Sequence, residues 1–521
     1  MTEKGTLSVL PGSHARTWIL LVCVIAGAAL LRFYALDFQS LWNDELASWK
    51  MSSHSDLSTV IFREAGGDFH PPGYHIMLHY WIKHFGDSER TLRLPSAIAG
   101  ILAVALVFLL GAHLYSTKEG LLGSAIMAVL WCPIFYSQMA RVYSILMLFI
   151  LINIYFWVLT TEDILSRGKL LLARHVAPYV AASCIACYLH YYALIVISVQ
   201  AFILGTVVLV RRSGLLCFAT TYMVILLAYS PWVPVMLRHA GTEFTWFDKP
   251  TVTHVLYYLQ FIFNKSPSLL LILTGIVLVS TSNWLIRHMR NPQTTSLIKR
   301  TLITDLGIVL WLFGPFCIVF ALCLIGKPIL RFYGLIYCVP AACLLLARAV
   351  FSLPLRDWAH VVVGSGLVIV FLWHLIGPMR FYSDPHVEQY PNQPQWDQFR
   401  EAVYFATDHE LFGPEALVLS CPSKELFQYY FLRRRAAKEI DLCVCDASII
   451  PKLDTLIYQG RSKYVFLIWA NKFPTGEIIQ YMVSRFALID HAKFIAAGVM
   501  VFSLENQAGS MENRSKRRRV L

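Results

Sequence analysis

Carboxylate and imidazole side chains gather in one polar stretch near the start of the chain, residues 37–81. Asp44 and Glu45 are adjacent in it, and His70 follows 25 residues after Glu45, directly before two prolines. A carboxylate in such a loop can act as a general base toward a hydroxyl or amine acceptor, or it can help to hold a metal ion. Adjacent acids in a loop are more commonly solvated charge, so both interpretations of Asp44 and Glu45 stay open.

The His70-Pro71-Pro72 motif is compatible with two roles. Proline fixes the backbone dihedral φ and is favoured in the first turn of a helix, so the motif can mark a helix start. Alternatively, the rigid backbone presents the His70 imidazole to a substrate or a metal ion. Spacing alone does not separate these two roles.

Cationic side chains border apolar runs at two later positions, Arg141 in YSQMARVYS and Arg331 in KPILRFYG, with Lys327 four residues before Arg331. A charge at the edge of a membrane helix is costly unless it is paired. Arg141 could therefore pair with Asp44 or Glu45, or these cations could bind an anionic leaving group. Guanidinium groups bind phosphate oxygens in a bidentate manner, so two or three cations in one pocket would suit a phosphate or pyrophosphate.

The composition predicts that membrane-spanning helices must position these side chains. Of the 521 residues, 57% are hydrophobic and only 15% are charged, whereas soluble proteins average about 25% charged residues. The mean hydropathy is +0.56, and the expected fold class is a polytopic α-helical membrane protein. The basic residues behind the net charge of +12 lie mainly between hydrophobic runs, which indicates cytoplasmic loops and lipid headgroups and no nucleic-acid partner.

About eleven membrane spans are expected from the length of the apolar runs. They lie at residues 17–36, 92–114, 119–137, 141–160, 175–191, 192–211, 215–237, 267–287, 303–325, 329–350 and 358–378. Counting the short, His-rich segment 71–86 as a twelfth span would place every later basic loop outside. The positive-inside rule therefore favours eleven spans, with residues 71–86 as an amphipathic helix at the outer interface. The polar loop, residues 136–143, residues 327–331 and the chain after about 380 then share the outer face.

The chain from residue 395 to residue 510 has ordinary polarity and predicts a separate soluble domain. Short apolar stretches alternate there with helical patterns at the spacing of a small α/β fold. The apolar stretches are 416–419, 464–468 and 498–502, and the helical patterns are 396–409, 423–436 and 476–487. No glycine-rich phosphate motif is present, so no nucleotide is assigned to this domain.

The expected organisation of the whole chain has four parts. They are a cytoplasmic N-terminus (1–16), a transmembrane domain (17–380) whose first outer loop (37–86) is catalytic, an extracytoplasmic α/β domain (395–510) and a basic tail (511–521).

Most of the twelve cysteines lie within apolar runs, where cysteine behaves as a small buried hydrophobe. Cys184 and Cys187 form a C-x-x-C motif inside a predicted span, and packing is their expected role. Cys421, Cys443 and Cys445 fall in the soluble domain and could form one disulfide in an oxidising compartment. Their spacing does not identify the pair.

Five motifs, taken in chain order, resemble a known family. They are LWNDELAS, HPPGYHIMLHYW, FGDSERTLRLPSAIAG, YSQMARVYS and KPILRFYGLIYCVPAACLLLA. This order closely resembles bacterial members of glycosyltransferase family 39, which are of the GT-C type. They are related to protein O-mannosyltransferases and, more distantly, to the aminoarabinose transferase that modifies lipid A. The resemblance extends well over residues 17–160 and moderately over residues 325–350.

The resemblance implies an inverting glycosyltransferase of the cell inner membrane that takes its sugar from a polyprenyl-phosphate donor on the extracytoplasmic side. Its acceptor would be a glycan, a lipid or a protein. Asp44 matches the loop aspartate expected to act as base or to orient the acceptor, with Glu45 as its acidic neighbour. The residues expected to contact the substrate or its phosphate are Arg141, Arg331, Lys327, His70 and Tyr143.

The chain departs from the family pattern in the Asn43-Asp44-Glu45 setting and in the many histidines of the loop that follows. These departures leave open whether a divalent metal participates. A transporter or flippase of lipid-linked sugars would share the basic outer pocket, but transporters place charges near the bilayer centre and show inverted repeats. The charges here collect at one face and the two halves do not match, which favours the enzyme.

Overall fold

The chain divides into two compact units, each built from two separate stretches of sequence. The membrane unit contains Met1–Leu36 and Ser48–Arg380, and the C-terminal unit contains Asp37–Ala47 and Phe381–Leu521. The structure, a computed structural model, describes residues 11–167, 172–241, 249–290, 295–326, 328–383, 388–390, 393–394, 397–423, 425–434, 440, 442–444, 447–459 and 462–504. Residues 37–47, which the sequence groups with the transmembrane domain, therefore fold with the C-terminal unit.

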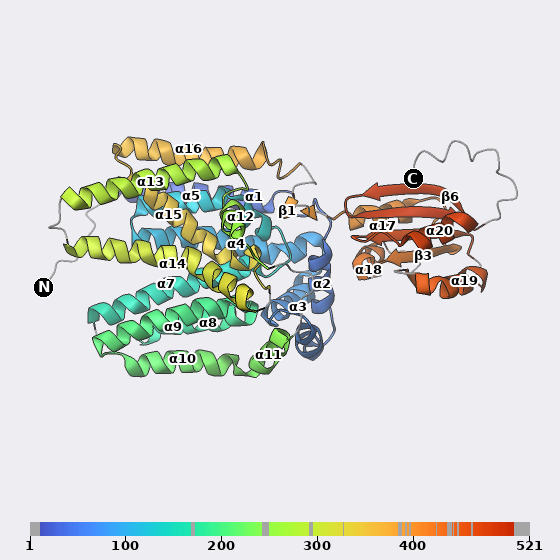
Figure 1. The fold of residues 1–521 in the computed structure, drawn as a ribbon, viewed down its shortest axis with the longest axis horizontal. Helices are drawn as coiled ribbons and strands as arrows, with labels where there is room; N and C mark the ends of the chain where they lie inside the picture. Colours follow the sequence, from blue (N-terminus) through green and yellow to red (C-terminus); the bar gives the residue numbers. More distant parts are fainter. Residues whose placement is uncertain are drawn as a thin grey trace. The chain divides into compact units, whose positions relative to one another are not determined.

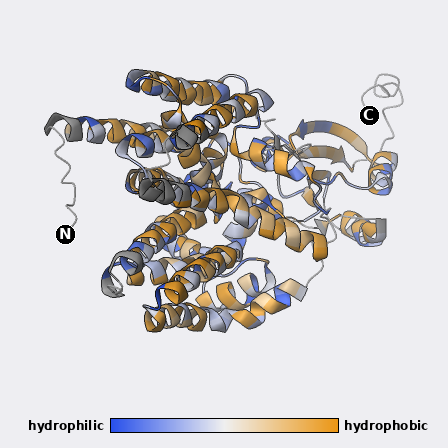
Figure 2. Ribbon diagram, turned by 60° about the vertical axis from the view of Figure 1, so that its left-hand side comes forward, coloured by the Kyte–Doolittle hydropathy of each residue, from blue (hydrophilic) through white to orange (hydrophobic). Residues whose placement is uncertain are grey.

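Eight segments of the described chain are long and apolar enough to cross a membrane. They are Ala15–Phe33, Glu89–Leu114, Tyr143–Asp163, Tyr192–Arg211, Leu215–Gly241, Ile303–Ile325, Phe332–Ser352 and Asp357–Ile376. Two pairs of bent helices raise the number to as many as ten, if each pair is one span. Hydrophobic residues dominate these helices along their length (Figure 2), and the predicted fold class, a polytopic α-helical membrane protein, is confirmed.

The helices of the membrane unit run in chain order as shown in Figure 1. They are α1 (Pro11–Phe33), α2 (Asn43–Ser52), η1 (Thr59–Ala65), α3 (Gly73–Phe85), α4 (Glu89–Leu114), α5 (Thr117–Val129), α6 (Trp131–Ser137), α7 (Tyr143–Arg167), η2 (Leu172–Val176), α8 (Ala177–Leu189), α9 (Tyr192–Arg211), α10 (Leu215–Tyr229), η3 (Ser230–Trp232), α11 (Val233–Gly241), α12 (Thr253–Ile262), α13 (Pro267–Arg290), α14 (Thr295–Ile325), η4 (Phe332–Cys338), α15 (Val339–Ser352) and α16 (Asp357–Ile376). The first residues of α2 belong to the C-terminal unit.

The predicted span at 119–137 is a bent pair, because α5 and α6 meet at an angle of 61°. Leu130 lies between them in an extended conformation, so it interrupts the helical hydrogen bonds. The backbone N–H of Trp131 donates instead to Oδ1 of Asn264, at 2.8 Å. The break is therefore stabilised by a side chain from the other bent pair, which α12 and α13 form with an angle of 91°.

Two other segments are not among these spans. The predicted span at 175–191 corresponds to η2 and α8, which follow each other without a break from Leu172 to Leu189. It is neither one of the eight segments nor one of the two bent pairs of the described chain, so the structure shows up to ten of the predicted eleven spans. Residues 71–86, predicted not to span, form α3, which has 13 residues.

Small residues allow α4 and α5 to pack at close range. A Cβ atom on Gly120 would lie 2.6 Å from the backbone N of Ala112 and 2.6 Å from the backbone O of Phe108. Since both are backbone atoms, neither could move aside as a flexible side chain does. Small residues at such helix contacts are typical of membrane proteins, where close packing replaces the hydrophobic effect as the cause of helix association.

The C-terminal unit contains a five-stranded mixed sheet of order β4-β3-β5-β7-β6. Strands β4, β3 and β5 are parallel, and β7 is antiparallel to both β5 and β6. The strands are β1 (Glu388–Tyr390) and β2 (Gln393–Pro394), which form a separate pair, and β3 (Ala416–Cys421), β4 (Leu442–Cys443), β5 (Tyr464–Ala470), β6 (Ala487–Phe494) and β7 (Ala497–Ser503). The helices are α17 (Phe399–Asp408), α18 (Glu425–Arg433), η5 (Ala447–Ile449), α19 (Ile450–Gln459) and α20 (Gly476–Arg485).

The predicted α/β domain is therefore confirmed in its main elements. The three predicted strands are β3, β5 and β7, and the three predicted helices are α17, α18 and α20. Strand β6 was not predicted, because it is an edge strand whose residues alternate between half-buried and exposed positions and lack a continuous apolar run. Helix α19 was not predicted either.

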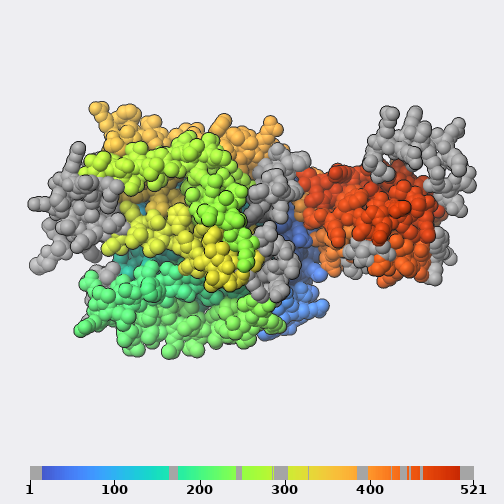
Figure 3. Space-filling model, viewed as in Figure 1, coloured from blue at the N-terminus to red at the C-terminus, as the bar shows by residue number. Residues whose placement is uncertain are grey.

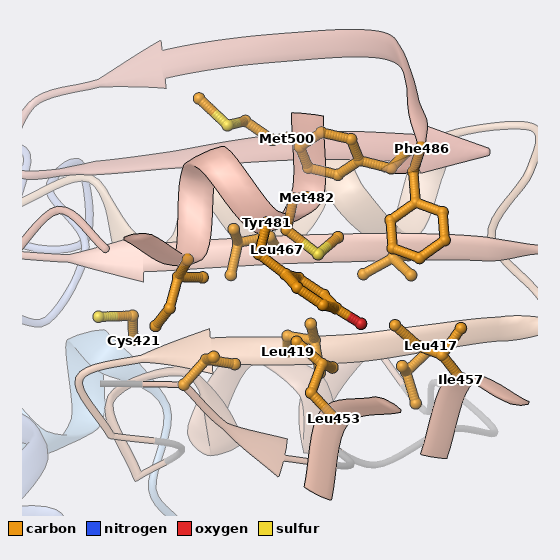
Figure 4. Close-up of a cluster of buried hydrophobic side chains, with 14 of the residues drawn as sticks. Leu417, Leu419, Cys421, Leu453, Ile457, Leu467, Tyr481, Met482, Phe486 and Met500 are labelled. Atoms are coloured by element: carbon orange, nitrogen blue, oxygen red, sulfur yellow. The ribbon is translucent and has the colours of Figure 1, made fainter. Parts of the chain in front are cut away.

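Helices cover the sheet on both faces, so its central strands are buried. On one face, Leu419 of β3 and Leu467 of β5 pack against Leu453 of α19 and Met482 of α20 (Figure 4). On the other face, α17 packs on β5, β6 and β7. Helix α17 is consequently held against the sheet.

The cysteines behave largely as packing residues. Cys187 is part of a buried cluster in the membrane unit, and Cys184 packs against that cluster. Within the described residues, neither Cys421 nor Cys443 is in a disulfide. Cys445, the third candidate for a disulfide, lies outside the described residues, as does the basic tail 511–521.

Candidate functional site

A half-buried carboxylate in the membrane unit lies between two imidazoles. Oδ2 of Asp68 is 3.0 Å from Nδ1 of His70 and 3.6 Å from Nε2 of His75. The two prolines after His70 lead directly into α3, which begins at Gly73. The His-Pro-Pro motif therefore starts a helix, as one of its two interpretations predicts, and the turn also holds His70 against Asp68.

The protonation states of this group follow from burial and from the neighbouring charges. Burial alone would raise the pKa of Asp68, but the charge of His70 and hydrogen bonds from His70 and His75 outweigh it and hold this pKa well below its ordinary value. Burial lowers the pKa of His75, and it lowers the pKa of His190 to well below the ordinary value. At neutral pH, Asp68 is a carboxylate, while His75 and His190 are neutral.

Arg141 supplies the positive charge of this site. It is almost completely buried, and its Nη1 donates a hydrogen bond to Oγ of Ser48 at 3.0 Å. Its charge lowers the pKa values of Asp68, His75 and His190, so the guanidinium lies within electrostatic range of all three. A buried guanidinium close to neutral imidazoles can bind an additional anion, because the imidazoles donate hydrogen bonds without competing for charge.

Aromatic rings connect Arg141 to the later parts of the chain. The Tyr143 ring centroid lies 5.8 Å from the Arg141 guanidinium carbon and 4.8 Å from the Tyr333 ring centroid. The His190 ring lies 5.5 Å from the His70 ring and 6.5 Å from the Tyr143 ring. Three of the predicted site residues, His70, Arg141 and Tyr143, are therefore brought together from segments that are far apart in sequence.

The segment that carries Arg331 packs beside His190. Arg331 precedes η4 in an extended conformation and is half-buried, two residues before Tyr333. A Cβ atom on Gly334 would lie 2.8 Å from the ring of Tyr192 and 3.4 Å from that of His190, so this segment packs tightly beside the imidazole group. Lys327, the remaining predicted cation, lies outside the described residues.

Asp44 and Glu45 belong to the C-terminal unit, where they occupy the first turn of α2. Glu45 is completely buried, and its Oε2 accepts the backbone N–H of Trp42 at 3.3 Å. This contact is one half of a capping box, in which an acidic residue at the third helical position satisfies the N–H of the capping residue. Glu45 therefore has a structural contact of its own, while Asp44 is half-buried.

Asp397 is a third carboxylate of this group, and the sequence analysis did not identify it. It is 8% exposed, and its carboxylate accepts hydrogen bonds from the backbone N–H of Asn43 and from the side chain of Asn471. Burial, together with the negative charges of Asp44 and Glu45, raises the pKa of Asp397 to about 7, although the two hydrogen bonds oppose this shift. A single aspartate before a helix carries no local signal of this role.

The raised pKa of Asp397 predicts a pH-dependent stability of the C-terminal unit. The unfolded chain loses this proton near pH 4, whereas the folded chain keeps it until about pH 7, so folding stability falls as the pH rises through that window. At 1.36 kcal/mol per pKa unit, the loss amounts to at most about 4 kcal/mol. Asp397→Asn, which stays neutral, should exceed wild type in melting temperature by more at pH 8 than at pH 5.

Thermal melting of the full chain in detergent measures this difference. If wild type and Asp397→Asn show the same change in melting temperature between pH 5 and pH 8, the ionisation of Asp397 does not limit the stability of the unit.

The described residues include no group of three or more His, Cys, Asp or Glu side chains arranged to hold a metal ion. Asp68 contacts both His70 and His75, and Nδ1 of His75 also lies 3.4 Å from Oγ of Ser52. Asp68, His70 and His75 all lie in the polar loop, but only His70 stands out in the sequence, because two prolines follow it. Their spacing of two and five residues around the prolines gives no hint that one carboxylate serves two imidazoles.

Comparison with known proteins adds evidence from outside the chain. Residues 69–237 match the family model described as dolichyl-phosphate-mannose-protein mannosyltransferase. No curated protein matches the chain in sequence. The matched stretch contains His70, Arg141 and Tyr143, so the similarity covers the residues that the structure brings together.

The fold of the chain is similar to that of solved membrane enzymes. The crystal structure of ArnT from Cupriavidus metallidurans bound to undecaprenyl phosphate matches with a TM-score of 0.55 and 14% identity, over 94% of this chain and 98% of that chain. The apo state of the same protein gives the same values. The archaeal oligosaccharyltransferase AglB from Archaeoglobus fulgidus, in complex with an inhibitory peptide and a dolichol-phosphate, gives a TM-score of 0.46 and 12% identity, over 88% of this chain and 70% of that chain.

Proposed function

We infer that this chain is a glycosyltransferase of the GT-C type, and we propose that it transfers a sugar from a polyprenyl-phosphate donor to an acceptor. The observation that carries this proposal is the match of residues 69–237 to a mannosyltransferase family, because this stretch holds His70 and Arg141. ArnT, whose fold the chain shares, was solved with undecaprenyl phosphate bound, which supports a donor of the same chemical class. The reaction would take place on the extracytoplasmic side of the inner membrane, and the positive-inside rule supports this orientation of the chain.

The proposed reaction is a single displacement with inversion at the anomeric carbon. An acceptor hydroxyl or amine attacks that carbon from the face opposite the phosphate, and the bond between the carbon and the phosphate oxygen breaks. The acceptor proton passes to Asp44, which acts as general base. The products are the glycosylated acceptor and polyprenyl phosphate, so the sugar is transferred without any change in oxidation state.

Stabilisation of the departing phosphate is the second task, because negative charge develops on it in the transition state. We propose that Arg141 binds two phosphate oxygens, assisted by Arg331 and Lys327. Asp68 holds His70 through Nδ1 at 3.0 Å, which leaves Nε2 of His70 to contact the donor. The neutral His190 adds a hydrogen-bond donor or acceptor without adding charge.

The lipid tail of the donor requires an apolar surface within the membrane. A groove of about 420 Å³ lies on the membrane unit between α9 and α14, two helices at the surface in Figure 3. Its lining residues are Leu194, Ile195, Ser198, Val199, Phe202 and Ile318. The groove begins two residues after Tyr192, whose hydroxyl donates to the backbone O of Ile329 near the Arg331 segment. We propose that the first isoprene units lie there.

Ser198→Trp tests this placement, because Ser198 is exposed on the groove and a tryptophan would fill it. Losing the burial of one isoprene unit, at about 1.5–3 kcal/mol, should lower kcat/KM for a long-chain donor by about tenfold or more. A donor with no isoprene unit, such as a sugar linked to methyl phosphate, should react equally well with wild type and variant.

Thr206→Trp is the matched control, since Thr206 is exposed on the same helix but does not line the groove. An equal loss in both variants, or a loss that does not depend on donor chain length, would exclude this groove as the tail site.

The proposed function is tested by a transfer assay in membranes with a panel of polyprenyl-phosphate sugars. Release of polyprenyl phosphate that requires the protein would identify both the reaction class and the donor sugar. Failure of every donor to react with the folded protein would contradict the proposal. Movement of the same donors across the membrane without release would instead indicate a flippase.

A further inference from the structure

The segment that carries Asp44 is structurally part of the C-terminal unit. Residues 37–47 cluster with residues 381–521, although more than 300 residues separate them in sequence. In the sequence, this stretch reads as an ordinary loop between two apolar runs. The conformation of residues 37–47 therefore depends on their contacts with the rest of the C-terminal unit.

Arg400 of α17 holds the first part of this segment. Its Nη1 donates to the backbone O of Asp37 at 3.0 Å and its Nη2 to the backbone O of Phe38 at 2.5 Å. Glu401 in turn accepts from Nε and Nη2 of Arg400, at 3.1 and 2.9 Å. The guanidinium is thus oriented on one side by Glu401 and binds two consecutive carbonyl groups on the other.

Two further contacts hold the middle of the segment. The backbone N–H of Leu41 donates to the hydroxyl oxygen of Tyr430 at 2.5 Å, and the hydroxyl of Ser40 donates to the backbone O of Asp397. Ser40, Leu41 and Tyr430 are all almost completely buried. Because a buried N–H without an acceptor is costly, the Tyr430 hydroxyl strongly favours this one backbone conformation.

Asp397 completes the arrangement at the start of α2. Its carboxylate accepts the backbone N–H of Asn43, the first residue of the helix. The first N–H groups of a helix have no partner within it, so an acceptor from elsewhere fixes where the helix begins. Asp44 is the next residue, and its backbone is set by this contact.

We propose that the C-terminal unit positions Asp44 for catalysis, through Arg400, Tyr430 and Asp397. These three residues contact residues 37–43, which lead directly into Asp44. They are positioning residues, since none of them takes a proton from the acceptor. The inference rests on the proposed function, in which Asp44 is the base, and it makes the C-terminal unit a part of the active enzyme.

Tyr430→Phe is the sharpest test, because it removes one oxygen atom and leaves the ring in place. Loss of the acceptor for Leu41 should lower kcat about tenfold, the effect of one lost hydrogen bond on a reaction that depends on alignment. The KM for the donor should stay within about twofold. Arg400→Ala should lower kcat further, and Arg400→Lys should recover part of the loss, since lysine can still donate to one carbonyl.

Tyr481→Phe is the matched control, because the Tyr481 hydroxyl contacts Asp454 within the same unit and not residues 37–47. It should retain wild-type kcat. Equal losses of kcat in Tyr430→Phe and Tyr481→Phe would show that the substitutions only destabilise the C-terminal unit, and would overturn the proposal. Full activity of Arg400→Ala would overturn it as well.

Hydrogen exchange of the full chain provides a readout that needs no turnover. In wild type, the amides of Leu41 and Asn43 should exchange slowly, and in Tyr430→Phe and Arg400→Ala they should exchange at least tenfold faster. Unchanged exchange would overturn the anchoring even if sugar transfer is never observed. Faster exchange with full activity would overturn the positioning role, while an inactive wild type with the expected exchange would contradict the proposed function alone.

Discussion

Asp44→Asn is expected to lower kcat for sugar transfer by a factor of about 10² to 10⁴, the usual contribution of a general base. Asparagine keeps the size of the side chain and its place in the first turn of α2, but it cannot accept a proton. Donor binding should change little, because the base acts on the acceptor. Initial rates of polyprenyl phosphate release, measured at equal protein levels over a range of concentrations of the reactive donor, give kcat and the KM for the donor.

Asp56→Asn is the control for this substitution. Asp56 lies in the same polar loop, and its Oδ1 accepts from Oγ of Ser58 at 2.6 Å and from the N–H of Thr59 at 2.8 Å. Asparagine can accept the same two bonds, so activity should remain at the wild-type level. A fall in kcat of less than threefold for Asp44→Asn would exclude Asp44 as the base.

Arg141→Lys should lower kcat/KM by about 10² to 10³, as expected when a preorganised donor to the transition state is lost. Lysine retains the positive charge but not the planar fork that binds two oxygens of one phosphate. Because the charge persists, the neutral state of His75 and His190 should also persist. Inhibition by free polyprenyl phosphate, the reaction product, should weaken in parallel.

Arg90→Lys is the matched substitution on the same unit, since Arg90 is exposed near the start of α4. It should leave both the rate and the product inhibition unchanged. If Arg141→Lys loses activity but binds polyprenyl phosphate as tightly as wild type, Arg141 does not contact the phosphate and its role lies elsewhere.

Hydropathy predicts most of the membrane helices, because a spanning helix must be apolar over about 20 residues. The bend between α5 and α6, in contrast, cannot be predicted from hydropathy. It depends on the N–H of Trp131 finding an acceptor in Asn264, 133 positions later, and no local pattern encodes such a partner. The two central parallel strands and β7 were predictable for the same reason as the spans, since buried strands require continuous apolar runs.

The candidate site was predictable in its residue types but not in its grouping. Arg141 and His70 stand out because charge and proline are unusual at the ends of apolar runs. The partnership of Asp68 with two imidazoles, and of His190 with His70, depends on how the helices pack. Sequence therefore indicates the chemistry, while the structure determines which groups share it.

The adjacent acids Asp44 and Glu45 show most clearly that the sequence alone does not assign roles to individual residues. In the sequence, Asp44 and Glu45 are equivalent candidates for one role. The start of α2 at Asn43 places Glu45 where it can reach back to the N–H of Trp42, and this gives Glu45 a capping contact that the sequence analysis did not consider. Asp397 was missed altogether, since its partner Asn43 lies more than 350 residues before it.

The C-terminal unit is discontinuous, and this has a consequence for how the protein is made. Residues 37–47 leave the ribosome early, but Arg400 and Tyr430 are synthesised some 350 residues later. At 5–20 residues per second, the acidic segment waits roughly 20–70 s for its partners. A chain whose synthesis stops in the last membrane helices would thus carry every cation of the site and still lack an ordered Asp44, so catalytic competence arrives only with the final part of translation.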